Sequence, residues 1–175
     1  MPIIVLFIHI ALCILAICSG AIVISDLLSN RLPERHTIFF LRCSLGSNIA
    51  ALFFQLHHLL PSQKVAMIAV YGSGVAILAW RKFRLRGAWR GAFALAIVLV
   101  LYLNILAISI QAFNYPQTMN GLAPDIFRVS QFALLGTFVF LGIVAAKRFS
   151  DGQGTWPTPI PSGSKRTVSH HLPVR

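Results

Sequence analysis

The sequence of 175 residues has few charged side chains, and carboxylates are the scarcest of them. Only 11% of the residues are charged, whereas a typical soluble domain carries about 25%. The four acidic residues, Asp26, Glu34, Asp125 and Asp151, all fall outside the long apolar runs. Glycine-rich phosphate loops, Gly-x-Ser-x-Gly elbows and His-Glu-x-x-His motifs are also missing. These absences argue against a hydrolase or an NTPase and favour a protein that is not an enzyme.

Cysteine is scarce as well, and the three cysteines form no Cys-x-x-Cys pair. The sequence therefore indicates neither a zinc knuckle nor a disulfide framework. The net charge of +11 is typical of nucleic-acid-binding proteins. Here, however, the cations lie between apolar runs and not along one face of a polar domain. We therefore expect no nucleic-acid partner.

Hydrophobic residues make up 57% of the chain and are gathered into long runs. A membrane span needs about 20 apolar residues. By this measure we predict an all-α bundle of five transmembrane helices, at residues 3–25, 37–59, 62–81, 91–113 and 129–146. The second segment is the least regular, because Arg42, Asn48 and Gln55 interrupt it.

The distribution of lysine and arginine supports a crossing by the second segment, because cytoplasmic loops carry the excess of these residues. With five spans and the amino terminus outside, twelve of the fifteen cations face the cytoplasm and two face out. If the second segment does not cross, the division becomes ten against five. We therefore predict a bacterial inner-membrane protein with its carboxyl terminus in the cytoplasm.

The basic stretch RKFRLRGAWRG, residues 81–91, is then a tight cytoplasmic turn. Anionic lipid headgroups attract such clusters, and the predicted headgroup contacts are Arg81, Lys82, Arg84, Arg86 and Arg90. Residues 149–175 are rich in proline, glycine and serine, which predicts a disordered basic tail after a transmembrane domain of residues 1–148.

Polar side chains inside the predicted spans are the candidate ligand-binding residues. Asn48 is followed seven residues later by Gln55, and Asn104 is followed seven residues later by Gln111. Seven residues are two helical turns, so each pair lies on one face of its helix. These amides either hydrogen-bond across helices and fix their register, or line a polar cavity that opens outward.

Histidines near the outer surface are further candidates. His9 lies in the first span, and His57 and His58 close the second. Together with Gln55, Gln111 and Gln131 they could form a polar cluster in the outer leaflet. Two imidazoles from different helices can ligate haem b or copper. In the alternative interpretation, His57 and His58 are interfacial and His9 donates a hydrogen bond to a neighbouring backbone carbonyl.

Several segments resemble a widespread group of small, uncharacterised bacterial multi-pass membrane proteins. The resemblance spans roughly residues 5–149. It is carried by HHLLPSQ (57–63), VAILA (75–79), FRLRGAWR (83–90), LYLNILAISIQAF (101–113), LAP (122–124) and the stretch from Gln131 to Phe149. Members of the group have an acidic run with paired prolines after LAP, which this chain lacks. The resemblance implies fold and location only, and it transfers no catalytic residues.

We therefore expect a non-enzymatic membrane component that binds a small ligand or a partner subunit and holds no cofactor. The expected partners are membrane lipids, with a second membrane protein or another copy of the chain as further candidates. One alternative is a small redox protein that holds haem, copper or a quinone through its outer histidines. A second alternative is a small-solute transporter. The sequence, however, shows neither the broken helices nor the buried charges that are common in that class.

Overall fold

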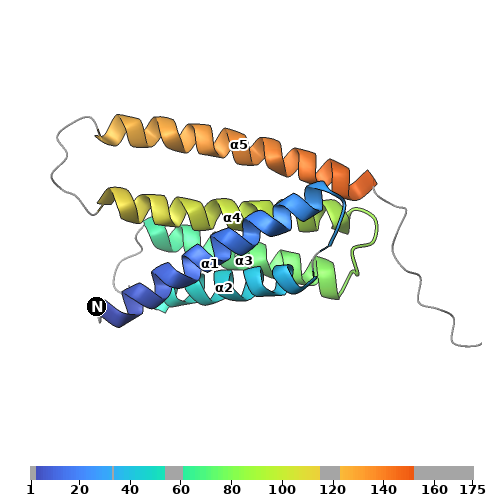
Figure 1. The fold of residues 1–175 in the computed structure, drawn as a ribbon, viewed down its shortest axis with the longest axis horizontal. Helices are drawn as coiled ribbons and strands as arrows, with labels where there is room; N and C mark the ends of the chain where they lie inside the picture. The colour runs from blue at the N-terminus through green and yellow to red at the C-terminus, as the bar shows by residue number, and fades with distance from the viewer. Residues whose placement is uncertain (1–2, 33, 54–60, 115–122, 152–175) are drawn as a thin grey trace, which may run out of the picture.

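The structure is a computed structural model that describes residues 3–32, 34–53, 61–114 and 123–151. These residues form five helices and the short connections between them (Figure 1). The helices are α1 (Ile3–Leu28), α2 (Glu34–Phe53), α3 (Pro61–Arg81), α4 (Trp89–Asn114) and α5 (Ala123–Asp151). The prediction of an all-helical chain with five helices is confirmed.

The helix boundaries differ most from the predicted spans at α5. Hydropathy marks only residues 129–146, but the helical backbone continues through Lys147 and Arg148 to Asp151. Residues 149–151 therefore belong to α5 and not to the tail. The remainder of the predicted tail, and residues 54–59 of the predicted second span, lie outside the described residues.

α1 ends at Leu28, beyond its predicted span of residues 3–25, and backbone hydrogen bonds determine where it ends. Asn30 adopts a left-handed backbone conformation, with φ of 56°. Its N–H donates to the carbonyl of Leu27 at 3.0 Å, and the N–H of Arg31 donates to the carbonyl of Asp26 at 2.8 Å. This pair of bonds is the Schellman motif, which satisfies the last carbonyls of a helix and reverses the chain.

Successive helices run in opposite directions, so α1, α3 and α5 end at the same end of the bundle (Figure 1). In the interior, α4 packs against α1, α3 and α5, and α2 packs against α1 and α3. The apolar span of α4 is 50% buried, whereas that of α5 is only 11% buried. Thus α4 is the central helix, and α5 is a peripheral helix attached mainly to it.

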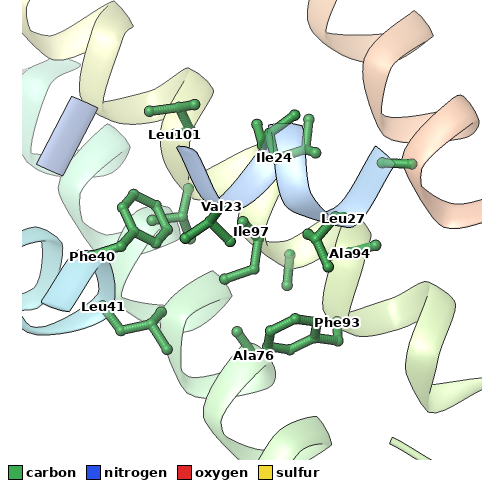
Figure 2. Packing of buried hydrophobic residues seen from close by; sticks show 14 of the residues in the cluster. Val23, Ile24, Leu27, Phe40, Leu41, Ala76, Phe93, Ala94, Ile97 and Leu101 are labelled. Atoms are coloured by element: carbon green, nitrogen blue, oxygen red, sulfur yellow. The ribbon is translucent and has the colours of Figure 1, made fainter. Parts of the chain in front are cut away.

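The core is formed where four helices converge around α4. Val23 and Leu27 from α1 meet Phe40 from α2 and Phe93 and Ile97 from α4, and all five side chains are fully buried (Figure 2). Side chains of α2 and α4 lie close to α1 at Gly20, where a Cβ atom would lie 2.8 Å from Leu101 Cδ1 and from Phe40 Cε2. Only glycine leaves room for that approach.

Four of the described helices contain a stretch that is long and apolar enough to cross a membrane. These stretches are Phe7–Leu28, Gln63–Arg81, Trp89–Ile110 and Ile126–Asp151. The described part of α2 does not meet this criterion, because it carries Glu34, Arg35 and Arg42 and ends at Phe53.

Lysine and arginine gather at one end of the bundle, which we call the basic end. There α1, α3 and α5 end and α2 and α4 begin (Figure 1). Its described cations are Arg31, Arg35, Arg81, Lys82, Arg84, Arg86, Arg90, Lys147 and Arg148. The opposite end, which we call the far end, carries Lys64 and Arg128 among the described residues.

Gly20 offers a test of the helix packing. We expect Gly20→Ala to lower the free energy of unfolding by about 1–3 kcal/mol, as for other overpacked cores, because Leu101 and Phe40 are themselves buried. Gly74→Ala is the matched control, since a Cβ there meets nothing within 4 Å. Thermal unfolding in detergent measures both variants. Equal stability of the two would contradict the packing described for α1.

Candidate functional site

The predicted ligand-binding residue His9 lies in a buried polar contact between α1 and α2. Its Nδ1 lies 3.2 Å from the backbone carbonyl oxygen of Ser47 and 3.1 Å from the Ser47 hydroxyl oxygen. The ring therefore donates to the carbonyl in one tautomer and accepts from the hydroxyl in the other. Cys13, one turn further along α1, lies 2.8 Å from the same hydroxyl through its sulfur. His9 thus has polar partners within the bundle.

The two predicted asparagines meet each other in a second buried contact, between α2 and α4. The amide nitrogen of Asn48 donates to Asn104 Oδ1 at 3.3 Å. The amide nitrogen of Asn104 donates to the Ser44 hydroxyl at 2.8 Å and to the carbonyl of Val100 at 2.9 Å. Both asparagines are at least 95% buried. The interpretation that these amides bond across helices agrees with this geometry.

Both contacts share α2, because Ser44, Ser47 and Asn48 are three and four residues apart and lie on neighbouring positions of its surface. One side of this polar face bonds to α1 and the other to α4. We call these residues, with His9, Cys13 and Asn104, the polar network. Ser44, Ser47 and Cys13 were not predicted as site residues. The spacing of Ser44, Ser47 and Asn48, which are three and four residues apart on one helix, is the pattern in the sequence that could have indicated Ser47.

Of the remaining predicted members of the outer polar cluster, Gln131 is the one whose side chain the structure describes. Gln131 lies on α5, where its Oε1 is buried without a hydrogen-bond partner in the described part of the chain. Gln111 lies in α4, and the structure describes only its backbone. Gln55, His57 and His58 lie outside the described residues, so the outer cluster stays a prediction.

A metal or haem site would need more ligands than the described residues bring together. Among them, no group of three or more histidine, cysteine or acidic side chains is placed to hold a metal ion. His9 Nε2 and Cys13 Sγ form a pair at 3.8 Å. The haem and copper hypotheses depend on His57 or His58 as a further ligand and stay predictions.

A large apolar groove, which the sequence did not reveal, runs between α3 and α5 over the surface of α4. Its volume is about 530 Å³, within the range of about 300–1,000 Å³ found for small-molecule pockets. Tyr71 and Val75 of α3 form one wall, and Leu135, Val139 and Ile143 of α5 form the other. Small residues of α4, Ala92 and Ala96, lie along its floor. Tyrosine hydroxyls are the polar side-chain groups of its lining.

The basic turn after α3 is compact, and one of its cations is bound inside the protein. Phe83 and Trp89 stack with their ring centroids 3.8 Å apart. Arg90 donates to Asn30 Oδ1 at 3.2 Å and lies 4.5 Å from the centroid of the Phe149 ring. By contrast, Arg81, Lys82, Arg84 and Arg86 are exposed, and their contact with lipid headgroups stays a prediction.

The polar network yields a prediction for the two asparagines. We expect Asn104→Leu to lower the free energy of unfolding by about 0.6–1.7 kcal/mol, the range measured for hydrogen bonds between membrane helices. Combined with Asn48→Leu, it should cost less than the sum of the two single changes, because both remove the same bond. Ser109→Ala is the control, since that hydroxyl donates to Ile105 of its own helix. Full additivity in thermal or denaturant unfolding would show that the asparagines are not coupled.

Comparisons with protein-family models, with curated proteins and with solved structures find no match to this chain. The resemblance to small bacterial membrane proteins stays a prediction that rests on the segments quoted above.

Proposed function

We propose that the chain is a multi-pass protein of the bacterial inner membrane in which all five helices cross the bilayer. Four of them carry apolar stretches of sufficient length. The case for α2 comes from direction, because α1 and α3 both run from the far end to the basic end (Figure 1). If both cross the membrane, the chain has to return between them, and α2 runs back against both.

The distribution of charge supports an orientation with the basic end in the cytoplasm. Nine described cations lie at the basic end and two at the far end, and cytoplasmic loops hold the excess of lysine and arginine in bacterial membrane proteins. α1 begins at the far end and α5 ends at the basic end (Figure 1). The proposed amino terminus is therefore outside, and the proposed carboxyl terminus is cytoplasmic.

Within the membrane, the chain acts as a non-enzymatic component that binds an apolar ligand in the groove between α3 and α5. The observation that carries this proposal is a cavity of about 530 Å³ with an almost wholly apolar lining. The polar network is a weaker candidate site, because Asn48 already bonds to Asn104 and Ser47 bonds to Cys13 of α1, and these side chains are buried. A ligand there would have to break those bonds, whereas the groove needs no rearrangement.

Single cysteines placed at exposed positions test the topology. In intact cells, a membrane-impermeant maleimide should label Lys64→Cys and leave Arg31→Cys and Arg86→Cys unlabelled until the membrane is permeabilised. All three wild-type side chains are exposed. Cys18→Ser serves as the background for these variants and as the blank, since Cys18 is exposed whereas Cys13 and Cys43 are buried. If α2 does not cross, Arg31→Cys and Lys64→Cys will label alike.

A groove-filling substitution tests the proposed binding site. We expect Val139→Trp to reduce the amount of apolar ligand retained by the purified protein at least tenfold, because Val139 lines the groove and the indole takes up its space. Phe140→Trp is the matched control, since Phe140 is exposed on the same helix and does not line the groove. Mass spectrometry of organic extracts measures the retained molecule. Equal retention by both variants would overturn the proposed site.

A further inference from the structure

We propose that the ligand of the groove is an anionic phospholipid of the cytoplasmic leaflet, with one acyl chain in the groove and its headgroup between Lys82 and Lys147. This inference rests on the proposed function, because it names the molecule that the groove binds. It is carried by three features of the described residues: the length of the groove, the direction in which its walls continue, and the chemistry at its mouth.

The length of the groove matches one leaflet and not a whole membrane. Along α4 its lining runs from Ala92 to Tyr102, which is about 15 Å at a rise of 1.5 Å per residue. The hydrocarbon core of a bilayer is about 30 Å thick. The groove therefore begins one turn inside the basic end and stops near mid-membrane. A partner helix that spans the bilayer would need a groove of twice this length, whereas a single acyl chain fills one leaflet.

The wall formed by α5 leads directly to a lysine. Leu135, Val139 and Ile143 follow one another at intervals of four residues, so they lie along one face of the helix. The next residue in this series is Lys147, which is exposed at the basic end. Lys147 therefore lies one turn beyond the end of this wall, where its long side chain can reach a headgroup above the groove.

The wall formed by α3 continues to a second lysine in the same way. Tyr71 and Val75 line the groove, and Lys82 follows Val75 by seven residues, which is two turns. The N–H of Lys82 donates to the carbonyl of Leu78 at 2.9 Å, so its backbone continues the helical pattern beyond the last residue of α3. Its side chain is exposed. Lysines from both walls thus lie at the mouth.

The mouth also has the aromatic side chains that are common at the level of lipid headgroups. Trp89 opens α4 one turn before Ala92 and stacks on Phe83 of the basic turn. The described carboxylates at this end are Asp26 of α1, Glu34 of α2 and Asp151, which is the last residue of α5 and lies one turn beyond Lys147. None of them lies on α3 or on the turn after it, which carry Arg81, Lys82, Arg84 and Arg86. Cations therefore outnumber carboxylates at the mouth, which favours an anionic headgroup.

Charge and not chain length should determine which lipid is bound. The apolar lining of the groove offers the acyl chains of different phospholipids the same contacts, so it does not distinguish lipids that share the same chains. Each lysine near the membrane surface contributes about fivefold to the binding of an anionic lipid. Two lysines therefore predict about a thirtyfold preference for an anionic over a zwitterionic headgroup with the same acyl chains.

Native mass spectrometry of the full chain in detergent, with equal amounts of phosphatidylglycerol and phosphatidylcholine of identical chains, tests the proposal. We expect one retained lipid per protein and a preference of about thirtyfold for phosphatidylglycerol. The double variant Lys82→Gln with Lys147→Gln should still retain lipid but without preference. The control is Lys64→Gln with Arg128→Gln, which removes two cations from the far end and should keep the preference.

The outcomes separate this inference from the proposed function. If Val139→Trp abolishes retention but wild-type protein binds both lipids equally, the groove is a binding site and the headgroup assignment is wrong. A preference that survives Lys82→Gln with Lys147→Gln also overturns the assignment. Retention of a quinone or another uncharged lipid in place of phosphatidylglycerol overturns it as well. If Val139→Trp retains lipid like wild type, both the inference and the proposed function fail.

Discussion

Polar side chains that are buried among apolar helices cannot bond to water, so most of them require a donor or an acceptor within the protein. In this bundle the requirement falls mainly on α2, whose Ser44, Ser47 and Asn48 are buried. They are satisfied from α1, through His9 and Cys13, and from α4, through Asn104. Because hydrogen bonds depend on distance and direction, these contacts set the rotation and the depth of α2 against both neighbours.

The attachment of α5 is of a different kind, and the groove results from that difference. The hydroxyl of Thr137, in the middle of α5, donates a hydrogen bond to the carbonyl of Ala133 in the same helix and not to a neighbouring helix. α5 packs closely against α4 at Gly142, where a Cβ would lie 3.3 Å from Leu95, and the rings of Tyr102 and Phe138 meet at 5.7 Å between centroids. Dispersion contacts at these points leave the space towards α3 unfilled, and that space is the groove.

The helical elements could be predicted because apolar runs of span length are explicit in the sequence. Hydrogen bonding of Asn48 and Asn104 across helices was one of the two interpretations of their spacing, although the sequence did not indicate that they bond to each other. The helix ends were harder to predict. The capping of α1 at Asn30 and the last turn of α5 depend on backbone hydrogen bonds, which hydropathy does not report. The groove could not be predicted. Leu135 and Val139 look the same in sequence whether they face lipid, a neighbouring helix or a cavity, and only the packing of α3 and α5 around α4 distinguishes these cases.

Arg90 joins three parts of the chain at the basic end. Its guanidinium bonds to Asn30 in the turn after α1 and lies over the ring of Phe149 on α5, while its own backbone belongs to the first turn of α4. Arg148 adds a longer contact, at 3.5 Å, to the carbonyl of Leu28. α5 is therefore anchored at its last turns, close to where the groove opens. If α5 swings away from α4, this anchor is the pivot, and the groove widens first at the depth where an acyl chain ends.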